Sequence, residues 1–163
     1  MTKYKEDNFC ETYVIGMKVE NRFNDYLAYK KREVLERSSG YQPKHDFRFI
    51  DKNGIRTSAE VKTCTRVSND VPIEYESRGK ASGIVSTEGF YFVVYCIEDQ
   101  AFYVAKSGEL MEWLDSNPRS YISVKNTSNS SETKLYLIDK YTWRDTFSVV
   151  DLTHVAMLER EDL

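Results

Sequence analysis

Three residues whose side chains could hold and use a divalent cation lie close together in the sequence: Asp46, Glu60 and Lys62. Glu60 and Lys62 are two positions apart in a segment of alternating apolar and polar residues, so on a β-strand they share one face. A similar alternating segment precedes them, and the break between the two segments predicts a β-hairpin. Whether Asp46 joins the pair depends on the length of the hairpin loop.

Two loop lengths are compatible with the break. A two-residue Asn53-Gly54 turn would pair Asp46 with Val61 and place it on the face opposite to Glu60. A three-residue loop, 52–54, with Gly54 in the left-handed conformation, pairs Asp46 with Glu60 instead. The second register is favoured because it gathers the apolar residues on one face, ready for a helix to cover. The apolar face then holds Phe47, Phe49, Ile55, Ala59 and Val61, and the polar face Asp46, Arg48, Ser58, Glu60 and Lys62.

Two directly opposed carboxylates, about 5 Å apart at Cβ, repel each other unless one is protonated or a cation lies between them. Hard oxygen ligands suit Mg²⁺ or Mn²⁺, which would keep waters and take substrate phosphate oxygens as further ligands. Lys62 beside the cation could lower the pKa of an attacking water or hold a phosphate. A salt-bridged, solvated sheet face is the usual explanation of an isolated Glu-x-Lys, and the opposed Asp46 shifts the balance towards a metal site.

The residues just described resemble the core of the PD-(D/E)xK nuclease superfamily, in which an early acid and a Glu/Asp-x-Lys form a divalent-metal site. Asp46 matches the first acid, and Glu60 and Lys62 match the pair, whereas His45 stands where the motif has proline. The run 73–84 also resembles small endonucleases of this superfamily, and the likeness covers about residues 10–115. The resemblance implies hydrolysis of DNA phosphodiester bonds.

A helix is predicted from about Thr12 to Arg37, because apolar residues recur there at spacings of three and four. Glu20 falls on the apolar side of this helix. An acid in such a place is usually a boundary residue whose head reaches water, but the resemblance implies that a helical Glu before the hairpin supplies an extra metal ligand. We therefore expect Glu20 near the site, with the backbone carbonyl of Val61 as a further ligand.

Candidate DNA contacts lie on the hairpin and in a later loop. Arg48 shares the polar hairpin face, and Arg78, Lys80 and Ser82 follow a strand predicted over 71–76. Backbone N–H groups at the start of a short helix over 82–87, together with these cations, would suit a phosphate, although an ordinary basic surface loop fits equally well. In the strand itself, Glu74 and Glu76 share a face, and either of them could join the acids.

The composition sets the protein class. The chain of 163 residues, with 40% hydrophobic and 30% charged residues, is typical of one soluble globular domain. Its net charge of −3 argues against a generally basic nucleic-acid coat and leaves room for a local patch. Three widely spaced cysteines indicate a reducing interior, with neither a zinc ribbon nor a disulfide framework. The N-terminus does not resemble a signal peptide, and no apolar run approaches the roughly 20 residues that span a bilayer, so we expect a cytoplasmic protein without a membrane partner.

The later segments complete the expected fold. Residues 90–97 form an apolar run typical of a central strand, followed by a strand over 101–105, a helix from Ser107 to before Pro118, and strands over 134–138 and 147–152. Trp143 most simply packs the tail on the core, and His154 is interpreted as structural. We expect a mixed α/β (α+β) fold with a restriction-endonuclease-like core: a central mixed sheet flanked by helices, with extra C-terminal strands. One domain, 1–163, would comprise a core of about 10–117 and a C-terminal β extension of about 119–163.

The sequence thus predicts a DNA endonuclease that depends on Mg²⁺ or Mn²⁺, with Asp46, Glu60 and Lys62 as catalytic residues. The alternative is a non-catalytic domain that keeps the sheet and binds DNA or a protein through its loops. An enzyme of branched DNA would share the chemistry and differ only in substrate. Enzymes that recognise duplex DNA or cut branched junctions usually act as symmetric dimers. A homodimer is therefore a further expectation, although no segment of the sequence establishes it.

Overall fold

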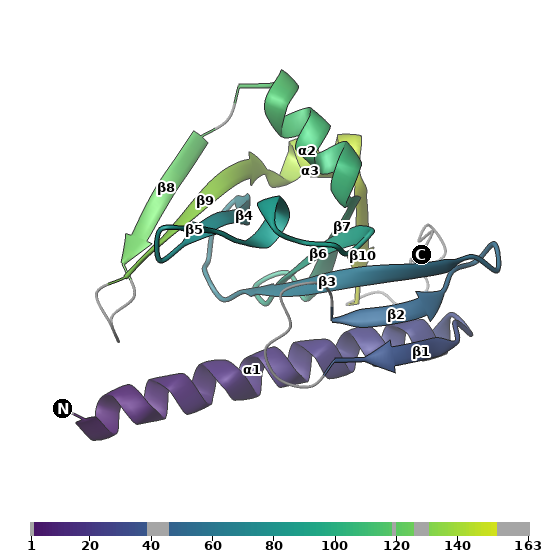
Figure 1. The fold of residues 1–163 in the computed structure, drawn as a ribbon, viewed down its shortest axis with the longest axis horizontal. Helices are drawn as coiled ribbons and strands as arrows, with labels where there is room; N and C mark the ends of the chain where they lie inside the picture. The colour runs from purple at the N-terminus through teal and green to yellow at the C-terminus, as the bar shows by residue number, and fades with distance from the viewer. Residues whose placement is uncertain (1, 39–45, 119, 126–130, 153–163) are drawn as a thin grey trace.

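The computed structural model describes residues 2–38, 46–118, 120–125 and 131–152, and side chains from residue 14 onwards. Within these ranges the strands form a six-stranded sheet, in the order β1-β2-β3-β6-β7-β10, and a four-stranded sheet, in the order β5-β4-β9-β8 (Figure 1). In chain order the elements are α1 (Thr2–Tyr29), β1 (Val34–Arg37), β2 (Phe47–Ile50), β3 (Arg56–Cys64), β4 (Asp70–Ser77), β5 (Lys80–Ala81), the 3₁₀ helix η1 (Gly83–Val85), β6 (Tyr91–Cys96), β7 (Ala101–Lys106), α2 (Ser107–Ser116), β8 (Ser120–Lys125), β9 (Glu132–Asp139), α3 (Lys140–Thr146) and β10 (Ser148–Asp151).

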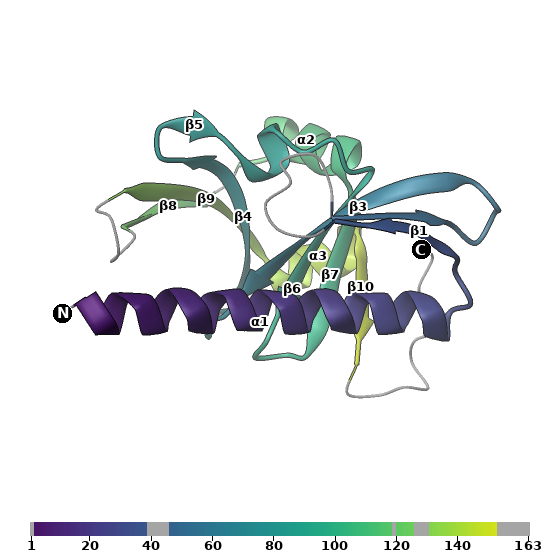
Figure 2. The same ribbon diagram turned by 60° about the horizontal axis from the view of Figure 1, so that its bottom comes forward.

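The six-stranded sheet is mixed and lies between helices, which confirms the predicted fold class. Strands β3 and β6 are parallel, and the sheet's other neighbouring strands are antiparallel. Helix α1 runs along one face (Figures 1 and 2), where Phe23 packs edge-on against Phe47 and Phe102. Residues of α2 and α3, among them Leu110 and Trp143, pack on the opposite face. Because both faces are covered, every residue of β6 is buried.

The first helix has other bounds than predicted. It begins at Thr2 and ends at Tyr29, and the segment 34–37, predicted as helical, is strand β1. The chain leaves the helix through Lys31, which has a φ of 58°, while the N–H of Arg32 donates to the carbonyl of Leu27 at 2.8 Å. A residue in the left-handed conformation, followed by an N–H that bonds back to the last turn, is a common end of a helix. The residues after it form β1 and pair with β2, although their apolar spacing is that of a helix.

The hairpin of β2 and β3 has the predicted three-residue loop. The N–H of Asp51 donates to the carbonyl of Ile55 at 2.9 Å, and Gly54 has a φ of 75°. Phe47 lies opposite Ala59, so the next position places Asp46 opposite Glu60. The prediction that Ile55 belongs to the apolar face is wrong: it precedes β3 and is 60% exposed. The other four predicted apolar residues are buried in the core against α1.

The connection between the parallel strands β3 and β6 passes through the second sheet. It contains β4, β5 and η1, and β4 pairs with β9. The second sheet lies towards the opposite end of the molecule from the turn of the β2–β3 hairpin (Figure 1). Strand β8 was not among the predicted strands. Trp143 is fully buried, which confirms its packing role, whereas His45 and His154 lie outside the described residues.

Candidate active site

Asp46 immediately precedes β2 and forms hydrogen bonds through both its backbone and its side chain. Its N–H donates to the carbonyl of Ala59 at 2.9 Å, and its carbonyl accepts from the N–H of Ser38 at 2.8 Å. Its carboxylate oxygen Oδ2 accepts from the N–H of Val61 at 2.7 Å. The side chain of Asp46 and the peptide of Val61, two of the predicted metal-site residues, therefore lie side by side.

Glu60 is a buried acid in the middle of β3, only 4% exposed. Its atom Oε2 is buried and has no hydrogen-bond partner among the described residues. Burial raises the pKa of Glu60 from an ordinary 4.5 to about 7, and the carboxylates of Asp46 and Glu74 add to this rise, whereas Lys62 and the Thr87 hydroxyl oppose it. The site thus contains a carboxyl group that a proton or a cation would stabilise.

The loop between η1 and β6 closes over Glu60. The hydroxyl of Thr87 is hydrogen-bonded to the Glu60 carboxylate and accepts the N–H of Gly89 at 3.0 Å. A Cβ added to Gly89 would lie 2.9 Å from the backbone nitrogen of Glu60, so a larger residue does not fit there without a shift. The Ser107 hydroxyl donates to the Gly89 carbonyl at 2.6 Å and secures the loop. Sequence reasoning missed Thr87 and Gly89 because only the crossover connection brings them to Glu60.

Lys62 lies between two carboxylates. Its Nζ is 3.8 Å from Oε1 of Glu60 and 3.9 Å from Oε2 of Glu74. Glu76, which shares the strand β4 with Glu74, instead pairs with Lys134 at 2.9 Å. A bulge between Glu74 and Glu76 separates them in register, so the structure brings Glu74 and not Glu76 to the acids.

Glu20 reaches the same region from α1. Partial burial raises its pKa, the Asp46 carboxylate adds to this rise, and Arg37 and Lys62 oppose it. The carboxyl group of Glu20 is therefore close enough to Asp46 and Lys62 for their charges to change its pKa. Whether it contacts a metal ion stays a prediction.

The four predicted DNA-contact residues separate into two groups. Arg48 lies on β2, half exposed, and pairs with Glu36 at 3.5 Å. Arg78 and Lys80 are exposed around the turn between β4 and β5, and Ser82 precedes η1, which has three residues. The role of these three residues in binding phosphate stays a prediction.

The fit of a divalent cation follows from the donor set. Among the residues that the structure describes, no three Asp, Glu, His or Cys side chains lie close enough together to coordinate one metal ion. Mg²⁺ does not need three, since it is usually bound by one or two carboxylates, with waters and substrate phosphates as the other ligands. Asp46 and Glu60 supply that number, and the buried Oε2 of Glu60 is a donor without another partner in the described structure. The residues present therefore fit Mg²⁺ or Mn²⁺.

No helix in the described residues is both long enough and apolar enough to cross a membrane.

Comparisons with known proteins give one structural likeness to report. No family model and no curated protein matches the sequence. The fold is similar to the solved structure of a bacterial homing endonuclease, I-Ssp6803I, with a TM-score of 0.48 and 18% sequence identity over 78% of each chain.

Proposed function

We propose that this protein is a DNA endonuclease that depends on a divalent metal ion and acts at Asp46, Glu60 and Lys62. The observation that carries the proposal is the buried carboxyl group of Glu60. It lies opposite a second acid, its pKa is raised to about 7, and one of its oxygens has no partner in the described structure. A protein that uses this face only as a solvated surface has no need to bury an acid there.

The residues would divide the work as follows. Asp46 and Glu60 would hold Mg²⁺ or Mn²⁺, with the Val61 carbonyl and Glu20 as further ligands. The bound cation would polarise the scissile phosphate and lower the pKa of the attacking water. Lys62 would present its ammonium group to the phosphate, where it neutralises negative charge that grows in the transition state, or orient the water. Glu74 would keep the ammonium of Lys62 at the site through their ion pair.

The test is a cleavage assay on supercoiled plasmid, single-stranded and four-way-junction DNA, with Mg²⁺, with Mn²⁺ and with a chelator. We expect cleavage only with metal, and loss of cleavage in Asp46→Asn and Lys62→Met. Asp115→Asn, on the exposed side of α2, is the matched control and should cleave as the unmodified protein does. Circular dichroism of each variant shows whether it is folded.

Two outcomes would contradict the proposal: cleavage by Asp46→Asn at the unmodified rate, or cleavage that a chelator does not stop. DNA binding without turnover, unchanged by chelator, would instead support the non-catalytic binding domain. The substrate that is cut fastest decides between linear and branched DNA. A homodimer stays a prediction, which sedimentation of the protein with and without DNA can test.

A further inference from the structure

The polar face of the β2–β3 hairpin continues beyond the two acids. On this face the pair next to Asp46 and Glu60 is Arg48 opposite Ser58, and the pair after that is Ile50 opposite Arg56. Each pair lies about 6.6 Å further along the strands. The step is comparable with the separation of neighbouring phosphates in an extended single strand of DNA. A strand that leaves the acid pair along this face would therefore meet Arg48 and then Arg56.

A hollow of about 430 Å³ lies along this route, with lining residues that include Arg48, Arg56, Ser58, Phe90 and Lys106. It occurs where β3 runs past the start of β6, since their pairing begins at Ala59 and Tyr91. The volume is within the range of small-molecule sites, which begins at about 300 Å³. The route is thus a concave site as well as a charged surface.

The charges of this hollow suit a phosphate backbone. Its lining contains three cationic side chains and one carboxylate, that of Asp51, which accepts the N–H groups of Asn53 and Ile55 within the loop. Arg48 pairs with Glu36 at 3.5 Å and Lys106 with Glu109 at 4.0 Å, whereas no carboxylate among the described residues forms an ion pair with Arg56. Arg56 is thus the cation of this lining that a phosphate could neutralise without competing with a carboxylate partner.

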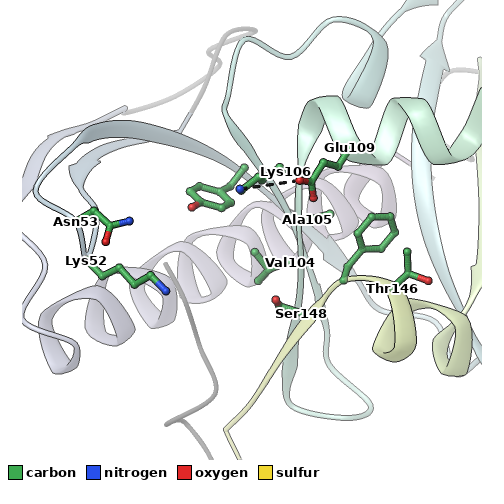
Figure 3. A pocket seen from close by; sticks show the side chains of 10 residues that line it. Lys52, Asn53, Val104, Ala105, Lys106, Glu109, Thr146 and Ser148 are labelled. Carbon is green, nitrogen blue, oxygen red and sulfur yellow. Dashed lines mark ion pairs between the residues drawn. The ribbon is translucent and has the colours of Figure 1, made fainter.

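Phe90 gives the hollow an exposed aromatic face. It is 51% exposed although it directly precedes the buried strand β6. Its N–H donates to the Ser58 hydroxyl at 3.0 Å, and the Nζ of Lys106 lies 5.9 Å from the centre of its ring. A second hollow of about 420 Å³ shares Lys106, Asn53 and Tyr91 with the first, and Figure 3 shows Lys52 and Lys106 on its two sides. Cationic side chains beside an exposed aromatic ring are the usual components of a single-strand binding groove.

We propose that this hollow binds a single-stranded nucleotide that flanks the scissile phosphate, with its base stacked on Phe90 and its phosphates held by Arg56 and Lys106. Inside a duplex both faces of a base are covered by the neighbouring base pairs, so a base has to leave the stack before it can lie on Phe90. The preferred substrate would therefore have an unpaired segment next to the cut. This inference rests on the proposed function for the position of the cut, and the binding site itself can be tested without cleavage.

The test measures binding in the Asp46→Asn background, where cleavage is not expected. Fluorescence anisotropy gives the Kd for fluorescein-labelled oligothymidylate of about 15 nucleotides, and for the same strand paired with oligodeoxyadenylate. Phe90→Ala and Phe90→Leu should weaken single-strand binding by about fivefold or more and leave duplex binding nearly unchanged. Tyr141→Ala, which removes an 81% exposed ring on α3, is the matched control and should have no effect.

Salt dependence tests the phosphate contacts. Arg56→Ala should lower the slope of log Kd against log salt concentration by about 0.7 for the single strand, as expected for one lost phosphate contact. Lys125→Ala, on the exposed strand β8, should leave the slope unchanged. Equal weakening of duplex and single strand by both Phe90 variants, or no weakening of either, would overturn the single-strand site. If the unmodified protein does not cleave DNA but these binding effects occur, the hollow stands and the proposed hydrolysis falls.

Discussion

Replacing Glu60 with glutamine is expected to stabilise the metal-free protein above neutral pH and to change its stability little in mild acid. Glutamine keeps the shape of the protonated side chain but cannot ionise. At high pH the native protein has to bury a charged carboxylate with one unpartnered oxygen, and the variant does not. The difference between the two proteins therefore isolates the free energy of burying that charge.

The magnitude follows from the pKa of Glu60, which rises from 4.5 in an ordinary environment to about 7 in the folded protein. Between these values the folded state binds more protons than the unfolded state, so the free energy of unfolding falls as the pH rises through this window. Each pKa unit corresponds to about 1.4 kcal/mol, and the full loss is about 3 kcal/mol. Most of it falls between about pH 5 and pH 8.

The assay is urea unfolding in the presence of a chelator, followed by tryptophan fluorescence, at several pH values in this range. The stability of Glu60→Gln relative to the unmodified protein should rise by about 2–3 kcal/mol between the two ends of the range. Glu112→Gln removes an exposed carboxylate on α2 and should show no such rise. A difference that stays constant with pH would refute the buried, ionisable role of Glu60.

Metal addition extends the same assay. At about pH 8 with Mg²⁺ at 100 times its Kd, the unmodified protein should gain about 2.7 kcal/mol, because the ion binds the folded state alone. Glu60→Gln should gain much less at the same concentration. Equal stabilisation of both proteins would show that Glu60 is not a ligand.

Four further substitutions test the surroundings of this acid, the helix α1 and the core. Gly89→Ala should destabilise the protein by about 1–3 kcal/mol in urea unfolding, because its Cβ would meet the backbone nitrogen of Glu60 at 2.9 Å. Gly16→Ala should stabilise it by about 0.5–1 kcal/mol in the same assay, because Gly16 is a residue of α1 with no atom within 4 Å of the added Cβ. Lys62→Met removes the cation that lowers the pKa of Glu60, so the pH-dependent fall in stability should extend to higher pH, and an unchanged midpoint would contradict the contact. Phe23→Ala deletes a fully buried ring and should cost about 3–5 kcal/mol in thermal or urea unfolding; a cost below about 1 kcal/mol would contradict its place in the core.

The opposed acids could be predicted from sequence because they depend on local rules. Gly54 in the loop and the apolar alternation on both sides select one register, and that register places Asp46 opposite Glu60. The same register predicts the place of Lys62, because residues two positions apart on a strand point to the same face of the sheet. The end of α1 could not be predicted in this way, because Lys31 carries no signal typical of a left-handed helix end and the sequence beyond it keeps a helical spacing.

Other parts of the site depend on contacts between distant segments. Glu74 and Glu76 are indistinguishable in an alternating strand, and only the bulge opposite β9 gives them different partners. Thr87 sits in a loop without periodicity, and its bond to Glu60 exists because the crossover returns beside β3. From the sequence, Phe90 is the first residue of an apolar strand. In the structure the pairing of β6 begins one position later, at Tyr91, and the ring of Phe90 is exposed.

The crossover between β3 and β6 also sets an order in which the site can assemble during folding. The bond between Asp46 and Val61 joins residues only 15 apart, within a hairpin that can close early. The β4 strand that carries Glu74 pairs with β9, where Asp70 meets Asp139, a contact of much greater separation in the chain. Contacts of high sequence separation slow folding, so the acid pair is expected to form first and the partner of Lys62 to arrive last. A nascent chain would then present its two opposed carboxylates together with Lys62, on the same strand as Glu60, before Glu74 reaches the ammonium group.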